Sequence, residues 1–98
     1  MEVIFGSAEL MNCYQESERA IRRWGPDIGR RYVARIHVLY AAARFSDLFT
    51  IRSLGLHPLK GDRQGQYAIK LVGRWRLVIV PVGEDKVCLE EVTRHYGD

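Results

Sequence analysis

Hydrophobic and polar positions change their period about halfway along this chain. In the first half apolar residues recur at helical spacing, in two sets. The first set is Leu10, Met11, Tyr14, Ile21 and Trp24, and the second is Ile28, Tyr32, Ile36, Leu39, Tyr40 and Ala43. From Tyr67 onward apolar and polar residues alternate instead, as in half-buried strands. The pattern therefore predicts helices first and strands afterwards.

The helical half begins with a predicted short strand at Glu2–Phe5. Ser7 can cap a following helix, which the apolar spacing extends to Trp24. Gly25-Pro26 ends that helix and opens the next one, because glycine suits a helix end and proline a first turn. A joint this short predicts an antiparallel helical hairpin. On its second helix Arg30, Arg31 and Arg35 are expected to lie off the apolar stripe.

The strand half predicts three strands joined by short turns. Residues 67–72 alternate, residues 75–80 are apolar except for Arg76, and residues 87–92 form the last strand. The apolar run fits a central strand, and the short turns make the three an antiparallel meander. One helical turn at residues 46–49 precedes them. The predicted fold is α+β in the order β-α-α-β-β-β, as one domain over residues 1–98.

In this arrangement the helical hairpin covers one face of the sheet. The other face is then partly open and carries the polar strand side chains. Lys70, Arg76, Glu90 and Glu91 are strand residues that cannot all be buried. The open face is therefore the expected place of function.

Composition narrows the class of protein. The chain has 98 residues, of which 47% are hydrophobic, and no apolar run reaches the ~20 residues of a membrane helix. Its first residues lack the basic start and apolar core of a signal peptide, so a cytoplasmic protein is expected. Cys13 and Cys88 are expected as free thiols. The three histidines show no zinc-ligand spacing with them, so no metal site is expected.

Charge is unevenly distributed although the net charge is only +3. From Arg19 to Arg44 there are seven arginines against Asp27 alone, and from His57 to Arg76 five Lys or Arg against Asp62 alone. Two basic blocks indicate a surface for a polyanion, since phosphate contacts depend on clustered Lys and Arg. For the first block, arginines that are simply solvated are an equally good interpretation.

The stretch from Leu56 to Tyr67 interrupts the regular pattern with a histidine, a proline, two glycines and charges. RNA cleavage without a metal needs proton carriers and a positive field at the phosphate. His57, Lys60 and Arg63 lie at the entry to the sheet, and Arg76 projects from the central strand. His95 and Tyr96 follow the last strand.

Each of these residues also has a purely structural interpretation. His57 would hydrogen-bond a loop backbone, Lys60 would face solvent, and His95 would belong to a frayed tail. Arg76 needs a partner because an unpaired buried charge is costly. Glu90 or Glu91 would supply that partner as a structural salt bridge.

The segment Leu56-His57-Pro58-Leu59-Lys60-Gly61-Asp62-Arg63-Gln64-Gly65-Gln66-Tyr67, followed by Trp75-Arg76-Leu77, resembles the HigB branch of the RelE/ParE toxin superfamily. The resemblance implies a RelE-like fold, with an antiparallel sheet and a helical hairpin. It implies a toxin of a type II toxin-antitoxin system that cleaves messenger RNA on the translating ribosome. The implied partners are the ribosome, its mRNA and a HigA-like helix-turn-helix antitoxin, with operator DNA bound only through the antitoxin complex.

Carried over by position, the resemblance implies catalytic roles for His57, Lys60, Arg76 and His95, with no cofactor and no metal. RNA contacts are expected from four further basic residues and one tyrosine of this region: Arg63, Lys70, Arg74, Arg94 and Tyr96. The sequence departs from the family's Asp-Tyr-His ending, because Thr93 and Arg94 precede His95.

Two other functions stay open at this point. ParE-like members of the superfamily inhibit DNA gyrase without nuclease chemistry, and the arginine-rich second helix would suit such a contact. A decayed toxin would bind only its antitoxin. The histidine and lysine of the His57–Lys60 element favour the nuclease, because a gyrase inhibitor has no need of them.

Overall fold

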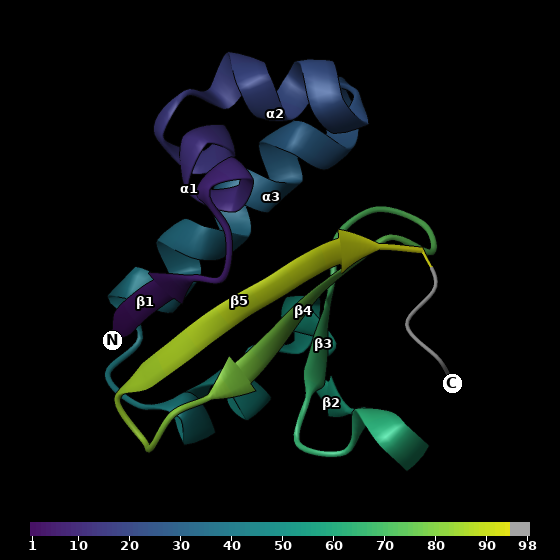
Figure 1. Ribbon diagram of the computed structural model, residues 1–98. Helices are drawn as coiled ribbons and strands as arrows, with labels where there is room; N and C mark the ends of the chain where they lie inside the picture. The colour runs from purple at the N-terminus through teal and green to yellow at the C-terminus, as the bar shows by residue number, and fades with distance from the viewer. Residues whose placement is uncertain (95–98) are drawn as a thin grey trace.

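The computed structural model describes residues 1–94. The chain forms a strand, three helices, three short 3-10 helices and four further strands (Figure 1). In order these are β1 (Glu2–Phe5), α1 (Ala8–Gln15), α2 (Ser17–Trp24), α3 (Pro26–Ala41), η1 (Phe45–Thr50), η2 (Arg52–Leu54), β2 (His57–Pro58), η3 (Gly61–Arg63), β3 (Tyr67–Lys70), β4 (Arg76–Pro81) and β5 (Lys86–Thr93). The predicted α+β class is confirmed, as is the general order of an N-terminal strand, then helices, then strands.

The five strands form one mixed sheet in the order β1-β5-β4-β3-β2. Strands β3, β4 and β5 make the expected antiparallel meander, with β4 at its centre. Strand β1, for which no partner was predicted, pairs with β5 in parallel, so the sheet as a whole is mixed. Helices separate β1 from β5 in the sequence, and a connection of that length permits parallel pairing. The two-residue strand β2, antiparallel to β3, was not predicted.

The first predicted helix is two helices. Glu16 has an extended conformation with φ −125° and ψ 95°, and it divides α1 from α2. The residues one turn beyond Tyr14 are Ser17 and Glu18, so a continuous helix would have a polar gap in its apolar stripe. The break lets the two apolar faces bury independently.

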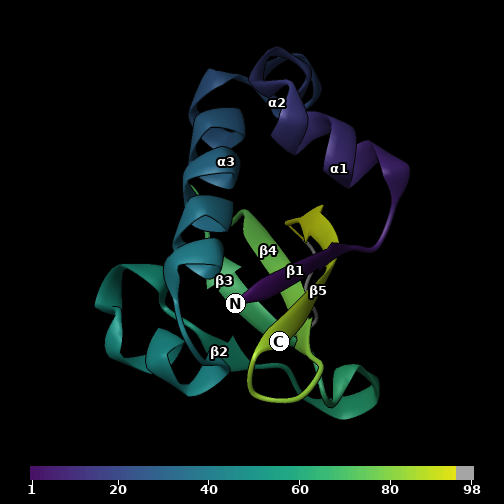
Figure 2. The same ribbon diagram turned by 90° about the vertical axis from the view of Figure 1, so that its left-hand side faces the viewer.

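Helix α3 forms the core with one face of the sheet. Tyr32, Ile36 and Leu39 are fully buried, and they belong to the same cluster as the inward residues of the strands: Ile69, Leu77, Ile79 and Leu89. The Tyr32 hydroxyl donates a hydrogen bond of 2.6 Å to the carbonyl of Leu10 and so ties α3 to α1. Figure 2 shows α3 along one side of the sheet, with α1 and α2 beyond its end.

The prediction that Arg35 lies off the apolar stripe is wrong. Arg35 is only 8% exposed, and its guanidinium donates to the carbonyls of Lys70 at 2.9 Å and Ser53 at 2.8 Å. It lies three residues after Tyr32 and four before Leu39, which places it on their face of the helix. Burial, and secondarily the nearby charge of Arg31, lowers the pKa of this guanidinium.

The opposite face of the sheet carries a second, smaller apolar cluster. It consists of Leu59, Ala68 and Val78, which are buried apart from the main core. We call this side, away from α3, the open face.

Both cysteines are free, as expected; Cys13 is buried and Cys88 half-buried. Across residues 1–94 the structure contains no helix with the length and apolar character that a membrane-spanning segment needs.

The close contact between α2 and α3 at Gly29 predicts that a larger residue there would lower the stability of the protein. A Cβ atom on Gly29 of α3 would lie 2.7 Å from the backbone nitrogen of Ile21 and 2.8 Å from the carbonyl carbon of Ala20. Helix propensity alone would make Gly29→Ala stabilising by about 1 kcal/mol. Because backbone atoms cannot yield, we expect overpacking to dominate and the free energy of unfolding to fall by about 1–3 kcal/mol in urea.

Ala34→Gly is the matched control, since Ala34 is an exposed residue of the same helix. It should cost about 1 kcal/mol through propensity alone. A stabilising effect of Gly29→Ala would contradict the close packing of α2 on α3.

Candidate functional site

Two rows of side chains cross the open face. Residues opposite one another in neighbouring strands share a face. The pairings therefore place His57, Ala68, Val78 and Glu91 in one row, which we call the His57 row. The next row, the Arg76 row, consists of Lys70, Arg76 and Thr93. Strand spacing of about 4.8 Å and row spacing of about 6.6 Å put the Cα atoms of His57 and Arg76 about 12 Å apart.

An irregularity in β5 decides which of its residues belong to these rows. Val78 pairs with Glu91 while Ile79 pairs with Leu89, so Glu90 is an extra residue in the strand. Such a bulge reverses the alternation beyond it. Leu89 before the bulge is buried in the main core, and Glu91 and Thr93 after it lie on the open face. In a regular strand that alternates without interruption from Leu89, Glu91 and Thr93 would both face α3.

His57 is half-buried at the edge of the sheet. Its Nδ1 lies 3.1 Å from the carbonyl oxygen of Gly55. Because a carbonyl oxygen only accepts, Nδ1 carries the hydrogen, and in the neutral ring Nε2 holds the lone pair. Gly55 has φ +54°, and a Cβ there would lie 2.5 Å from Cδ of Lys70. A larger residue at position 55 would collide with the Lys70 side chain. Glycine therefore lets this segment lie against the end of β3 with its carbonyl next to His57.

Arg76 is half-buried at the start of β4. Its Nη1 donates to the carbonyls of Gly73 at 2.8 Å and Trp75 at 3.0 Å, both in the β3–β4 turn. Its Nε atom is shielded from solvent. These contacts hold the guanidinium at the end of the open face, between Lys70 and Thr93.

Glu91, considered above as a partner of Arg76, forms its salt bridge with Arg63. Arg63 of η3 pairs with the Glu91 carboxylate through Nη2 and donates from Nε to the side-chain oxygen of Gln66 at 2.8 Å. The ion pair ties the loop after β2 to β5, across the sheet. It places one arginine and one carboxylate over the open face.

Arg35 of α3 donates hydrogen bonds to the two segments that carry His57 and the Arg76 row. Its two carbonyl partners are Ser53 in η2, before Gly55 and His57, and Lys70 at the end of β3. One guanidinium thus fixes the approach to His57 and the end of the Arg76 row.

The structure brings some of the predicted residues together and leaves others at the margin. His57, Arg63, Lys70 and Arg76 lie on or over the open face, and Lys60 is exposed at the start of η3. Arg74 is exposed in the β3–β4 turn and Arg94 just beyond β5. His95 and Tyr96 lie outside the described residues.

Three residues of the site were not predicted: Glu91 as the partner of Arg63, Thr93, and Arg35. The first two depend on the bulge, for which the sequence carries no periodic signal. Arg35 had a signal, its spacing from Tyr32 and Leu39 on the helix.

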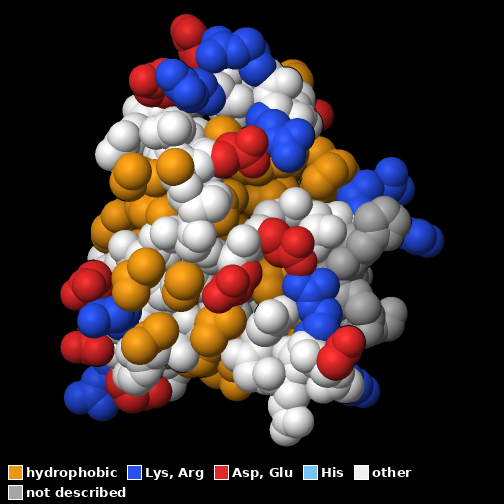
Figure 3. All heavy atoms as spheres, viewed as in Figure 1, with side chains coloured by type: hydrophobic (Ala, Val, Ile, Leu, Met, Phe, Trp, Pro, Cys, Tyr) orange, Lys and Arg blue, Asp and Glu red, His pale blue; other side chains and the backbone are white. Residues whose placement is uncertain are grey.

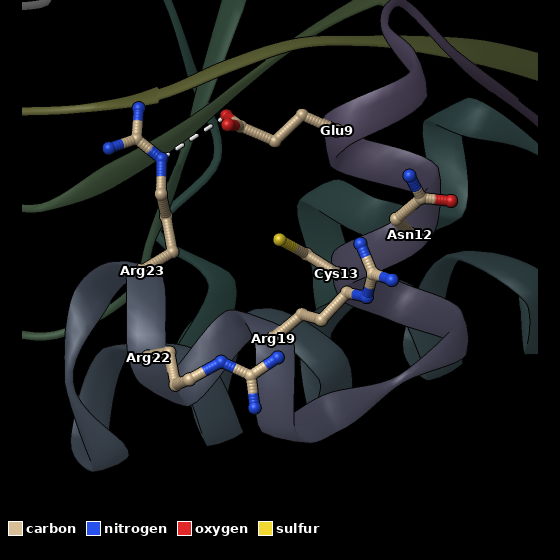
Figure 4. Close-up of a pocket in the computed structure, with 6 residues that line it drawn as sticks. All are labelled: Glu9, Asn12, Cys13, Arg19, Arg22 and Arg23. Carbon is tan, nitrogen blue, oxygen red and sulfur yellow. Dashed lines mark ion pairs between the residues drawn. The ribbon is translucent and has the colours of Figure 1, made fainter.

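A hollow of about 530 Å³ lies elsewhere, between α1 and α2 (Figure 4). It is lined by Glu9, Asn12, Cys13, Arg19, Arg22 and Arg23. Glu9 pairs with Arg23 at 3.2 Å and Glu16 with Arg19 at 2.7 Å, so two of the three arginines already have a carboxylate partner. Burial raises the pKa of the Cys13 thiol.

Within residues 1–94 no group of three or more His, Cys, Asp or Glu side chains is placed to hold a metal ion. In comparisons with known proteins, no family model matches the chain, and no curated protein matches it.

The buried position of Arg35 predicts a large loss of stability on substitution. In Arg35→Met the carbonyls of Lys70 and Ser53 lose two charge-assisted hydrogen bonds. We expect the free energy of unfolding to fall by about 3 kcal/mol, measured by urea denaturation.

Arg31→Met is the matched control. Arg31 is exposed and makes one longer hydrogen bond, 3.3 Å to the carbonyl of Leu71, so its loss should cost less than about 1 kcal/mol. Equal effects of the two variants would rule out a special role for Arg35.

Proposed function

We propose that this protein is a metal-independent endoribonuclease of the HigB-like type, a toxin that cleaves messenger RNA on the translating ribosome and so stops growth. The observation that carries the proposal is the placement of His57 and Arg76 in adjacent rows of one open face. A proton carrier and a phosphate-binding cation then flank a common space about 12 Å wide between their Cα atoms.

Cleavage begins with the ribose 2′-hydroxyl, which loses a proton as its oxygen attacks phosphorus. The bond from phosphorus to the 5′-oxygen breaks, and that oxygen takes up a proton. In the proposed function His57 exchanges one of these protons at Nε2, because Nδ1 donates to Gly55. Nε2 is shielded from solvent, as Nε of Arg76 is, so neighbouring side chains have to move aside for the RNA to reach it. The products are a 2′,3′-cyclic phosphate and a 5′-hydroxyl.

Arg76 is the proposed partner of the scissile phosphate. Its guanidinium is held by two carbonyls and does not have to be ordered when RNA binds. Lys70 stands directly opposite it in β3 and adds positive charge in the same row. Lys60 and Arg63 complete the proposed positive field from the loop after β2.

The second proton carrier in this proposal is His95, with Tyr96 as a surface for base stacking. The end of β5 supports this role, because Thr93 lies opposite Arg76 and the chain leaves the strand beside the Arg76 row. Arg94, exposed at this point, is a proposed contact to a neighbouring phosphate in place of the family's tyrosine.

A toxin of this kind needs partners, and a helix-turn-helix antitoxin of the HigA type is the one we propose. Operator DNA would be bound through the complex of the two. An adjacent reading frame that encodes such a protein would support this assignment.

Induction of single variants tests the nuclease, with new 5′ ends in messenger RNA as the readout. Losing one positioned acid, base or phosphate ligand should reduce cleavage by about 10²–10⁴-fold, so His57→Ala, Arg76→Ala and His95→Ala should each abolish growth arrest. His37→Ala is the matched control, because His37 is an exposed histidine of α3 on the other side of the sheet.

The pattern of cleavage separates the candidate functions. New ends that require ongoing translation support the ribosome-dependent nuclease. Intact messenger RNA with DNA damage would indicate gyrase inhibition, and a lack of both would indicate a chain that only binds an antitoxin. A His95→Ala variant that stays toxic at equal expression would exclude the proposed chemistry.

Removing the negative charge of Glu91, the partner of Arg63, should strengthen RNA binding, in contrast to the losses expected above. Glu91 puts a negative charge on the face where phosphate would bind and engages one of its cations. Glu91→Gln should therefore strengthen binding of a single-stranded RNA by about threefold or more at low salt, measured by fluorescence anisotropy. Glu90→Gln removes the same charge at the exposed bulge residue next to it and should have a smaller effect.

A further inference from the structure

A second hollow lies between α3 and the β3–β4 turn. It has a volume of about 490 Å³ and is lined by Asp27, Arg30, Arg31, Ala34 and Val72. Four of these residues come from α3, and Val72 comes from the turn. Arg31 donates to the carbonyl of Leu71 at 3.3 Å, which fixes the turn against the helix.

The turn itself links this hollow to the open face. Leu71 and Trp75 close it through a backbone hydrogen bond of 3.0 Å. Its carbonyls accept from Arg31 at one end, and from Arg76 at Gly73 and Trp75. Arginines from two different elements, α3 and β4, thus donate hydrogen bonds to the same short turn.

Charge along this route has one sign. The hollow and residues 70–76 together carry five basic side chains and one acidic one, Asp27; the basic ones are Arg30, Arg31, Lys70, Arg74 and Arg76. In Figure 3 Lys and Arg side chains project at the right of the molecule, where Figure 1 has this turn and the end of β5. The hollow between α1 and α2 differs, because Glu9 pairs with Arg23 there (Figure 4). Glu16 pairs with Arg19, a second arginine of the same hollow.

We propose that the hollow between α3 and the β3–β4 turn binds a backbone phosphate of the same single-stranded RNA, a few nucleotides from the phosphate at Arg76. This inference depends on the proposed function for its ligand. In this proposal Arg30 supplies the positive charge in the hollow and Val72 lines it with an apolar side chain. Arg74, in the turn, adds positive charge between the hollow and Arg76. A positive groove that follows the backbone is how single strands are bound without sequence preference.

Oligonucleotide length provides the test. Two RNAs of about three and about ten nucleotides, 2′-O-methylated to block attack on the phosphate, are titrated into the wild-type protein over a range of salt. The longer one should bind more tightly and with a steeper salt dependence, since it reaches the hollow.

Arg30→Glu should weaken the longer RNA by about three- to tenfold and reduce the salt slope by about 0.7–1.4, while the short RNA is unaffected. Arg22→Glu is the matched control. It makes the same charge change at an exposed arginine of α2, at the hollow between α1 and α2. A duplex RNA with the same number of phosphates should gain nothing from Arg30.

The results that would contradict the inference are the following. Equal losses in Arg30→Glu and Arg22→Glu, or an equal loss with the duplex, would overturn the inference in favour of a general charge effect. If the wild-type protein binds both lengths equally, the inference fails while the proposed function stands. If it binds neither, the inference fails as well, and the proposed ribosome-dependent function is decided separately by the translation-dependent cleavage of messenger RNA.

Discussion

A buried guanidinium links the helical half of this protein to the site on its sheet. Arg35 stands among the apolar residues of α3, where a charge is costly unless hydrogen bonds replace its water. Its partners are main-chain carbonyls in η2 and at the end of β3, and it joins these two segments to α3. The arrangement of His57 relative to Arg76 depends on both segments, so a core contact sets the geometry of a surface site.

The periodic features of the fold were predictable because burial imposes them along the chain. The two apolar stripes located the helices, and the apolar run around Arg76 located the central strand. The break between α1 and α2 at Glu16 could not be predicted, since a polar gap of a few residues is compatible both with a bend and with a continuous helix. The parallel pairing of β1 was also beyond reach, because no local pattern says which strand an edge strand joins.

The candidate site was predictable only in part, for a physical reason. His57, Arg63 and Arg76 stand out as polar residues in unusual settings, and all three lie on or over the open face. Which carboxylate meets which arginine depends on the bulge at Glu90, and one inserted residue changes no composition and little periodicity. The same insertion gives β5 two chemistries, apolar toward α3 before it and polar toward the open face after it.

The pairing of the first strand with the last has a consequence for the order of folding. Glu2 lies beside Lys86 and Phe5 beside Leu89, so the sheet closes over nearly the whole length of the chain. Contacts that distant form slowly, because the loop between them must be ordered first. Strand β5 also supplies Glu91 and Thr93 to the open face. A chain still emerging from the ribosome therefore lacks one wall of the site, and in the proposed function it is harmless to the ribosome that makes it until β5 is released.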